Sequence, residues 1–288
     1  MRAFAADLRS RRYDVVLDTQ GLMHSGSMAR LAVGRSHGYD ALSIREPLAA
    51  FSYDVRHRVS RNLGAIERNR RLTALALQYS FAAEVDYGLM ATWRRVQRPA
   101  PYAVLVHATS RPEKTWPIAS WLRVGNALSL RGLNLVLPAG SAAERERAAL
   151  MADALGGAVA PPTLPFERTL GLILDASLVI GVDTGLLHLA GALDVPTVAV
   201  FTSSNPTLTG PLGRGPIVIV GRKDGPPAVE DVLAAVDVVM SRAALSSGVV
   251  ARREGVDDGR KDFVYADVAR PAVSHVGAMA PPALGAGY

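Results

Sequence analysis

The sequence predicts an α/β fold in which a parallel β-sheet carries helices on both of its faces. Short apolar runs rich in Val, Ile and Leu alternate along the chain with longer stretches in which apolar residues recur at helical spacing. The short runs are continuously apolar, which is typical of parallel strands buried on both faces. The alternation of strand and helix implies right-handed crossovers between parallel strands.

Six apolar runs are expected to contain strands, because each one leads into turn-forming or polar residues that end it. In chain order these runs are Tyr13–Gly21, Tyr102–Ser110, Leu133–Gly140, Ser177–Gly185, Pro196–Ser204 and Pro216–Gly221. Helical spacing predicts helices between them, at Asn62–Tyr79, Ile118–Arg131, Ser141–Leu155, Phe166–Ala176, Leu186–Ala192 and Ala228–Ser241.

These elements divide the chain into four parts. Residues 102–243 predict a complete sheet domain, and two prolines in residues 96–101 indicate a linker before it. Residues 1–95 contain one convincing strand, so we expect the remainder of a domain that is poorly soluble or partly disordered, because an incomplete sheet exposes strand edges. Residues 244–288 are rich in Gly, Ala, Pro and Arg and predict a disordered tail.

The amino-acid composition limits the kinds of binding partner and site to be expected. The chain has a formal charge of +6, from 32 basic and 26 acidic residues, and its lysines are Lys114, Lys223 and Lys261. This excess favours acidic partners such as nucleic acid, an anionic membrane or a phosphorylated substrate, although a solvated basic surface is an equally simple interpretation. Without Cys, neither a disulfide framework nor a thiolate metal site is possible. No run is long enough to span a bilayer and no signal peptide is evident, so a cytoplasmic location is expected.

Ligands of open parallel sheets bind at the carboxyl ends of the strands, so the residues that follow each strand are the candidates for a site. Thr109, Ser110 and Lys114 follow the first strand of the 102–243 domain and precede a helix. Hydroxyls, a helix N-terminus and an ammonium can together hold phosphate oxygens. Alternatively, one hydroxyl caps the helix and Lys114 lies in solvent.

The next strand is followed by Ser141 and, three residues later, Glu144. This spacing is typical of a capping box, and capping is the favoured interpretation. The functional alternative is that Glu144 accepts hydrogen bonds from ribose hydroxyls.

The segment Asp183-Thr184-Gly185 joins a strand directly to a helix. Backbone N–H groups at the start of that helix, together with its dipole, favour an anion. Asp183 would then contact a sugar hydroxyl or cap the helix. His188 lies about one turn into the helix, where it either faces the cleft or is a satisfied core residue.

The N-terminal part offers fewer candidates. Asp18 and Gln20 follow its strand and either reach a cleft or satisfy loop backbone. Arg45, Arg56 and Arg58 belong to a basic stretch, whose simplest interpretation is a solvated helix surface.

Three segments resemble, in order and spacing, the donor-binding half of bacterial lipopolysaccharide heptosyltransferases of glycosyltransferase family 9. These segments are HATSRPEKTWP, LPAGSAAERERA and GVDTGLLHLAGALDVPTVAVFTSSNP. DTQGLMHSG and SIREPLAAFSYDVRHRVSRNLGAIERNRRL resemble the heptosyltransferase I branch of that family. The resemblance covers about residues 10–240. It implies the B-type glycosyltransferase fold, with two Rossmann-like domains of which the N-terminal one is incomplete here.

The resemblance also implies roles for the candidate residues. ADP-heptose would bind in the C-terminal domain, and Lys114 and Asp183 would act in catalysis. The implied donor-binding residues are Thr109, Ser110, Lys114, Glu144, Asp183, Thr184, Gly185 and His188. Arg45, Arg56 and Arg58 would bind the acceptor, the Kdo region of Kdo-lipid A. Because that acceptor is lipid-borne, we expect peripheral contact with the cytoplasmic face of the inner membrane.

The implied reaction is an inverting transfer without cofactor or divalent metal. Its general base in the family is an Asp in a Gly-Asp loop after the first strand, and residues 1–95 contain no such loop. We therefore expect a chain that begins downstream of this base, for which Asp18 is a weak substitute. The alternative is a catalytically inactive nucleotide-sugar-binding fragment. Nucleic-acid binding is suggested by charge alone and is not expected.

Overall fold

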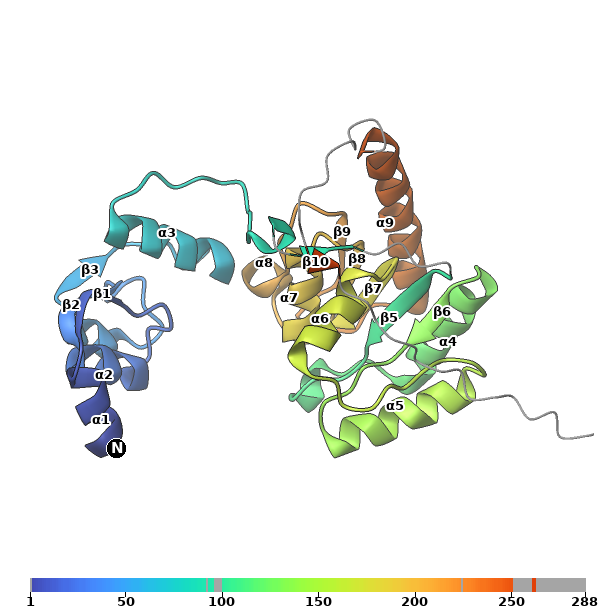
Figure 1. The fold of residues 1–288 in the computed structure, drawn as a ribbon, viewed down its shortest axis with the longest axis horizontal. Coiled ribbons are helices and arrows are strands. Elements are labelled where there is room, and N and C mark those ends of the chain that lie inside the picture. Colours follow the sequence, from blue (N-terminus) through green and yellow to red (C-terminus); the bar gives the residue numbers. More distant parts are fainter. Residues whose placement is uncertain (1, 92, 96–99, 224, 251–260, 263–288) are drawn as a thin grey trace, which may run out of the picture.

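The computed structural model describes residues 2–91, 93–95, 100–223, 225–250 and 261–262. Figure 1 shows a smaller N-terminal body, coloured blue to teal, beside a larger C-terminal body. Both are built from parallel strands and helices, so the predicted α/β class is confirmed.

The C-terminal body contains a five-stranded sheet in the order β6-β5-β7-β8-β9, with every neighbouring pair parallel. Each strand lies inside one of the predicted apolar runs. The bounds are β5 Tyr102–Val106, β6 Asn134–Val136, β7 Leu178–Val182, β8 Thr197–Phe201 and β9 Ile217–Gly221. The five C-terminal strands predicted from the apolar runs are therefore confirmed.

Helices cover both faces of this sheet. The helix bounds are η3 Pro112–Lys114, α4 Ile118–Leu130, α5 Ala142–Ala154, α6 Phe166–Leu174, α7 Gly185–Ala192, α8 Pro206–Thr209 and α9 Val229–Val250. Helices α4, α5 and α9 share one core with the sheet, and α6 and α7 share the other. The side chains of β5 alternate accordingly: Ala103 and Leu105 face the first core, whereas Val104 and Val106 face the second. A strand buried on both faces must be apolar throughout, which is why these runs were recognisable.

The strand order creates a crevice between β5 and β7. From β5 the chain crosses to β6 on one side and then continues through β7 on the other side. In doubly wound sheets of this order, ligands bind at the carboxyl ends of the two strands where the direction reverses. The loops that follow β5 and β7 are therefore the expected walls of a site.

The N-terminal body contains a three-stranded parallel sheet in the order β1-β2-β3. The element bounds are α1 Arg2–Arg9, β1 Arg12–Leu17, α2 Met23–Leu31, β2 Val33–Tyr39, η1 Pro47–Ser52, β3 Val55–His57 and α3 Ala65–Leu77. The expectation of a single strand here was wrong. Strand β2 reads VGRSHGY, in which glycine and polar residues hide the strand pattern.

Specific contacts hold β2 in place. Ser36 donates to the Asp54 carboxylate, with 2.8 Å between Oγ and Oδ2. Gly38 lies under the Tyr53 ring, where a Cβ would come within 2.3 Å of Cε2. Tyr39, Tyr53 and Leu72 then form much of a small core with neighbouring residues.

The chain passes between the bodies through η2 Leu89–Ala91 and β4 Trp93–Arg94, and β4 pairs with β10 Lys261–Asp262. Four residues of the expected linker, 96–99, lie outside the described residues. Helix α9 continues to Val250, which corrects the expected disordered tail for residues 244–250, and strand β10 corrects it for 261–262. Residues 251–260 and 263–288 lie outside the described part.

Candidate functional site

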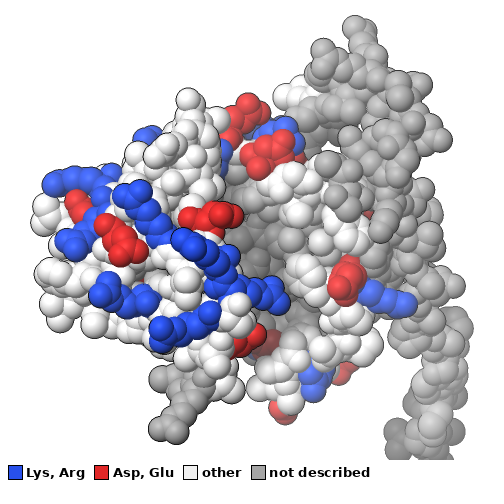
Figure 2. Space-filling model, turned by 60° about the vertical axis from the view of Figure 1, so that its left-hand side comes forward, with Lys and Arg blue, Asp and Glu red and all other residues white. Residues whose placement is uncertain are grey.

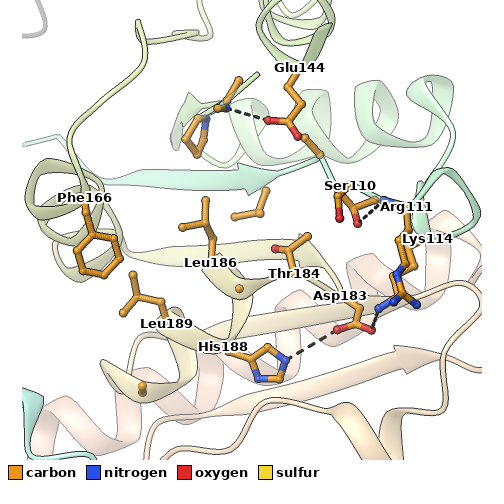
Figure 3. Close-up of a pocket in the computed structure, with 18 of the residues that line it drawn as sticks. Ser110, Arg111, Lys114, Glu144, Phe166, Asp183, Thr184, Leu186, His188 and Leu189 are labelled. Carbon is orange, nitrogen blue, oxygen red and sulfur yellow. Dashed lines mark hydrogen bonds and ion pairs between the residues drawn. The ribbon is translucent and has the colours of Figure 1, made fainter. Parts of the chain in front are cut away.

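A cavity of about 940 Å³ opens at the carboxyl ends of β5, β6 and β7. It contains all of the donor-site residues expected from the sequence: Thr109, Ser110, Lys114, Glu144, Asp183, Thr184, Gly185 and His188. Figure 3 shows those of them that it labels coming from separate loops and from the start of α7 toward one space. Residues scattered over 80 positions of sequence are thus brought together by the strand order.

The loop after β5 is held by several contacts at its base. Thr109 Oγ1 accepts a hydrogen bond of 3.3 Å from the backbone N–H of Arg111. The Thr202 hydroxyl, which follows β8, donates to the backbone carbonyl of Glu113 over 3.0 Å. Beyond the loop, the buried Trp116 ring anchors the chain in the core below α4. Lys114 therefore projects from a loop fixed at both ends.

Lys114 makes an ion pair with Asp183 across the crevice. Its Nζ lies 2.6 Å from Asp183 Oδ2, and the Ser204 hydroxyl donates to the same oxygen over 2.6 Å. His188 Nε2 lies 3.8 Å from Asp183 Oδ1, which is longer than a hydrogen bond. Figure 3 shows Lys114 and His188 pointing at the carboxylate from two sides. Two alternatives from the sequence are therefore wrong: Lys114 does not lie in solvent, and His188 is not a core residue.

Asp183 is ionised in this setting. Only 7% of the residue is exposed, and burial alone would raise the pKa of its carboxyl group. The neighbouring His188, Lys114 and Ser204 outweigh burial and hold this pKa well below its usual value. The crevice thus contains a fixed negative charge that is balanced by one ammonium.

The start of α7 provides donors for an anion. Thr184 is the N-cap residue but makes no side-chain cap bond, and its buried Oγ1 has no hydrogen-bond partner among the described residues. The first N–H groups of a helix also lack partners within the helix, and the helix dipole makes this end positive. A phosphate oxygen at this position would satisfy both kinds of group.

Glu144 forms the capping box that its spacing predicts. Its Oε2 accepts from the backbone N–H groups of Gly140 and Ser141 over 2.8 and 3.0 Å, and Ser141 Oγ accepts from the Glu144 N–H. The hydrogen bond from Ser141 is the main reason why the pKa of Glu144 is lowered. Capping is therefore confirmed. Because Glu144 also lines the cavity, contact with a ribose remains compatible with it.

The end of the cavity opposite Lys114 is apolar. Figure 3 shows Phe166, Leu186 and Leu189 grouped there. Tyr87 and Ile66 of the N-terminal part also line the cavity. The two bodies touch nearby, through α3 and α8 and through an Arg214–Asp86 ion pair of 3.4 Å. An apolar slot beside an ammonium and an open helix start fits a flat base joined to phosphates.

Sequence analysis selected neither the apolar residues Phe166, Leu186 and Leu189 nor three further residues, Ser204, Ile66 and Tyr87. Ser204 lies in the FTSSNP segment, where its position just after a strand could have identified it. Ile66 and Tyr87 gave no signal, because their place over the cavity depends on how the two bodies meet.

Asp18 accepts hydrogen bonds from its own loop and from its neighbours in the N-terminal body. Its Oδ1 accepts from the backbone N–H groups of Gln20 and Gly21, and its Oδ2 accepts from the hydroxyls of Ser25 and Tyr53. It is buried and lies outside the cavity lining. The interpretation that it satisfies loop backbone is therefore confirmed, and it is a poor candidate for a general base.

The predicted acceptor residues lie apart from this cavity. Arg45, Arg56 and Arg58 are exposed side chains of the N-terminal body, where Figure 2 shows basic side chains gathered. Arg56 lies over the Phe51 ring, 5.6 Å from its centroid. Arg58 lines a separate cavity of about 420 Å³. Arg56 and Arg58 lie on and just after β3, so the expected helical surface was wrong, although a solvated one is confirmed.

Within the described ranges, no group of three or more His, Cys, Asp or Glu residues is arranged to hold a metal ion. The described helices also include none with the length and apolar character required to cross a membrane.

The sequence model of glycosyltransferase family 9 (heptosyltransferase) matches residues 1–231. The chain belongs to this family. It is 41% identical over 220 residues to lipopolysaccharide heptosyltransferase 1 of Pseudomonas aeruginosa, covering 75% of this chain and 62% of that protein. It is 35% identical over 221 residues to lipopolysaccharide heptosyltransferase 1 of Escherichia coli K12, covering 75% of this chain and 69% of that protein. The resemblance to the heptosyltransferase I branch is thereby confirmed.

Solved structures of the family agree with the fold. The structure of E. coli heptosyltransferase WaaC with ADP superposes with a TM-score of 0.72 and 32% identity, covering 83% of this chain and 76% of that one. E. coli heptosyltransferase II, at 19% identity and a TM-score of 0.60 over 84% of this chain and 81% of that one, shares the fold. The predicted B-type glycosyltransferase class is confirmed by these matches.

Proposed function

We propose that this family 9 chain binds ADP-heptose and takes part in transferring its heptose to the Kdo region of Kdo-lipid A, in synthesis of the lipopolysaccharide inner core. One observation carries the proposal: a single crevice holds Lys114, the open start of α7 and an apolar slot. Relatives support it, because WaaC structures contain ADP or ADP-2-deoxy-2-fluoro heptose.

The proposed chemistry is a single displacement with inversion. An acceptor hydroxyl gives its proton to a general base and attacks the anomeric carbon of the heptose, while the bond to the diphosphate breaks and ADP carries away the electron pair. Negative charge grows on the diphosphate, so Lys114 and the N–H groups at the start of α7 stabilise the transition state more than the ground state. These groups supply positive potential where other enzymes use a metal ion, so the proposed reaction is metal-independent.

For the acceptor, we propose the basic face of the N-terminal body. Arg45, Arg56 and Arg58 are exposed there and suit phosphates and carboxylates of Kdo-lipid A. Because the acceptor is embedded in a bilayer, this face would contact the cytoplasmic side of the inner membrane.

The hydrogen bonding of Asp18 favours a second candidate function, which is donor binding without transfer. Its two oxygens receive four hydrogen bonds within the N-terminal body, so it is not placed to accept a proton from an acceptor hydroxyl. In this case ADP-heptose binds but no heptose is transferred. A transfer assay with Kdo-lipid A separates the two functions.

Calorimetric titration of ADP tests the donor site that both functions share. Lys114→Ala should weaken ADP binding by roughly ten- to a hundredfold, because a charge-assisted hydrogen bond contributes about 1.5–3 kcal/mol. Lys223→Ala is the matched control, since it removes the same charge from an exposed position outside the cavity. Equal affinity of the Lys114→Ala variant and the wild type, or no binding to the folded wild type, would refute the proposed site.

A further inference from the structure

We infer that Asp183 is a specificity-determining residue that distinguishes the sugar nucleotide from the nucleoside diphosphate product, because it competes with the diphosphate for Lys114. This inference rests on the proposed function and deepens it. It predicts that the carboxylate weakens ADP binding and so promotes release of the product.

The competition follows from the contacts of Lys114. Its ammonium lies 2.6 Å from Asp183 Oδ2, and its side chain is 19% exposed. A diphosphate at the start of α7 approaches the same ammonium, because Asp183 is the residue immediately before the N-cap Thr184. A phosphate oxygen can accept a hydrogen bond from Lys114 only if the ammonium leaves Asp183 or contacts both groups at once.

Ser204 keeps the carboxylate in place during this exchange. Its hydroxyl donates to the oxygen that Lys114 contacts, and it comes from the loop after β8 instead of the loop that carries Lys114. When Lys114 turns to a phosphate, Asp183 therefore retains a donor and stays at the site. Its lowered pKa means that it also remains charged at neutral pH, so repulsion is not relieved by protonation.

The two nucleotides present different groups to this charge. In a sugar nucleotide the terminal phosphate is esterified, and the adjoining sugar has hydroxyls that can donate to a carboxylate. After transfer, that phosphate is an unesterified terminal group, which gains a further negative charge above about pH 6. Asp183 accordingly offers a hydrogen-bond acceptor to the sugar of the donor substrate, whereas the product brings one more negative charge and no sugar hydroxyl.

The test compares ADP and ADP-heptose binding by calorimetry in the wild type and in Asp183→Asn. We expect Asp183→Asn to bind ADP about tenfold more tightly, and ADP-heptose no more tightly than the wild type does. Ser204→Ala, which leaves the charge unchanged, should not increase ADP affinity. Thermal melts check that each variant is folded.

The outcomes distinguish the inference about Asp183 from the proposed function. If ADP binds Asp183→Asn with unchanged or reduced affinity, Asp183 merely positions Lys114 or contacts the sugar, and the inference is overturned. If Lys114→Ala then still weakens ADP binding, the proposed function stands. If the wild type binds neither nucleotide, the proposed function fails as well.

A measurement on the wild type alone keeps the inference testable if Asp183→Asn does not fold. The three lysines of the chain allow the side-chain NMR signals of labelled lysine to be resolved, and Lys114→Ala assigns the relevant one. We expect ADP to shift the Lys114 signal, and adenosine to leave it unchanged. A Lys114 signal that is insensitive to saturating ADP would show that the ion pair persists and would overturn the inference.

Discussion

Replacing His107 by Leu should make the folded protein less sensitive to acid. His107 directly follows β5, below the loop that carries Lys114, and its side chain is fully buried. Neither ring nitrogen has a hydrogen-bond partner among the described residues. Burial, and next the positive charge of Arg147, lower the pKa of His107 to about 4, although the Glu144 charge opposes this. The ring is therefore neutral in the folded state at neutral pH.

The direction of the pH dependence of stability follows from the pKa of His107 in the folded and in the unfolded state. In the unfolded chain His107 takes up a proton near its usual pKa of 6.5, whereas in the folded protein it does so near 4. Acid therefore favours unfolding: the contribution is intact above about pH 6.5 and is lost as the pH falls toward about 4. The difference is worth about 3 kcal/mol in full, at about 1.4 kcal/mol per pH unit.

Urea unfolding at a series of pH values measures this contribution. Between about pH 7 and about pH 4.5, the wild type should lose roughly 2 kcal/mol more unfolding free energy than His107→Leu. His24→Leu is the matched control, since His24 is exposed, and it should follow the wild type. The stacked pair His37 and His57 also has lowered pKa values but is present in all three proteins, so its contribution cancels. Parallel pH profiles for His107→Leu and the wild type would refute the reasoning.

Two further substitutions test the N-terminal body. Tyr53→Phe removes a 2.6 Å hydrogen bond to buried Asp18, so the unfolding free energy in urea should fall by about 1–3 kcal/mol while ADP affinity is unchanged; altered ADP affinity at unchanged stability would contradict a structural role for Asp18. Gly38→Ala places a Cβ against the Tyr53 ring and should cost about 1–3 kcal/mol in the same assay. Gly225→Ala, with open space around its Cβ position, should be nearly neutral, and equal effects of the two alanines would count against the packing argument.

The C-terminal sheet was predictable because burial on both faces acts on every residue of a strand. Strand β7 is buried throughout, as is β8, so their apolar runs carry the strand signal without help from distant residues. Strand β6 is shorter than its run, since Pro138 cannot donate to a neighbouring strand.

The N-terminal sheet was not predictable in the same way. Strand β2 depends on partners far away in sequence: the Asp54 carboxylate for Ser36, and the Tyr53 ring for Gly38. Local propensity disfavours glycine in strands, and only these tertiary contacts reverse that preference. A pattern of period two could not reveal them.

The candidate site shows the same division between local signals and distant contacts. Position after a strand was enough to select Lys114 and Asp183 separately, because every strand of a parallel sheet presents its carboxyl end at one edge. It was not enough to pair them, since pairing requires β5 and β7 to be neighbours although β6 intervenes in the chain. Once that order is known, the two loops must meet, and a buried carboxylate beside an anion-binding helix start becomes understandable as the partner of Lys114.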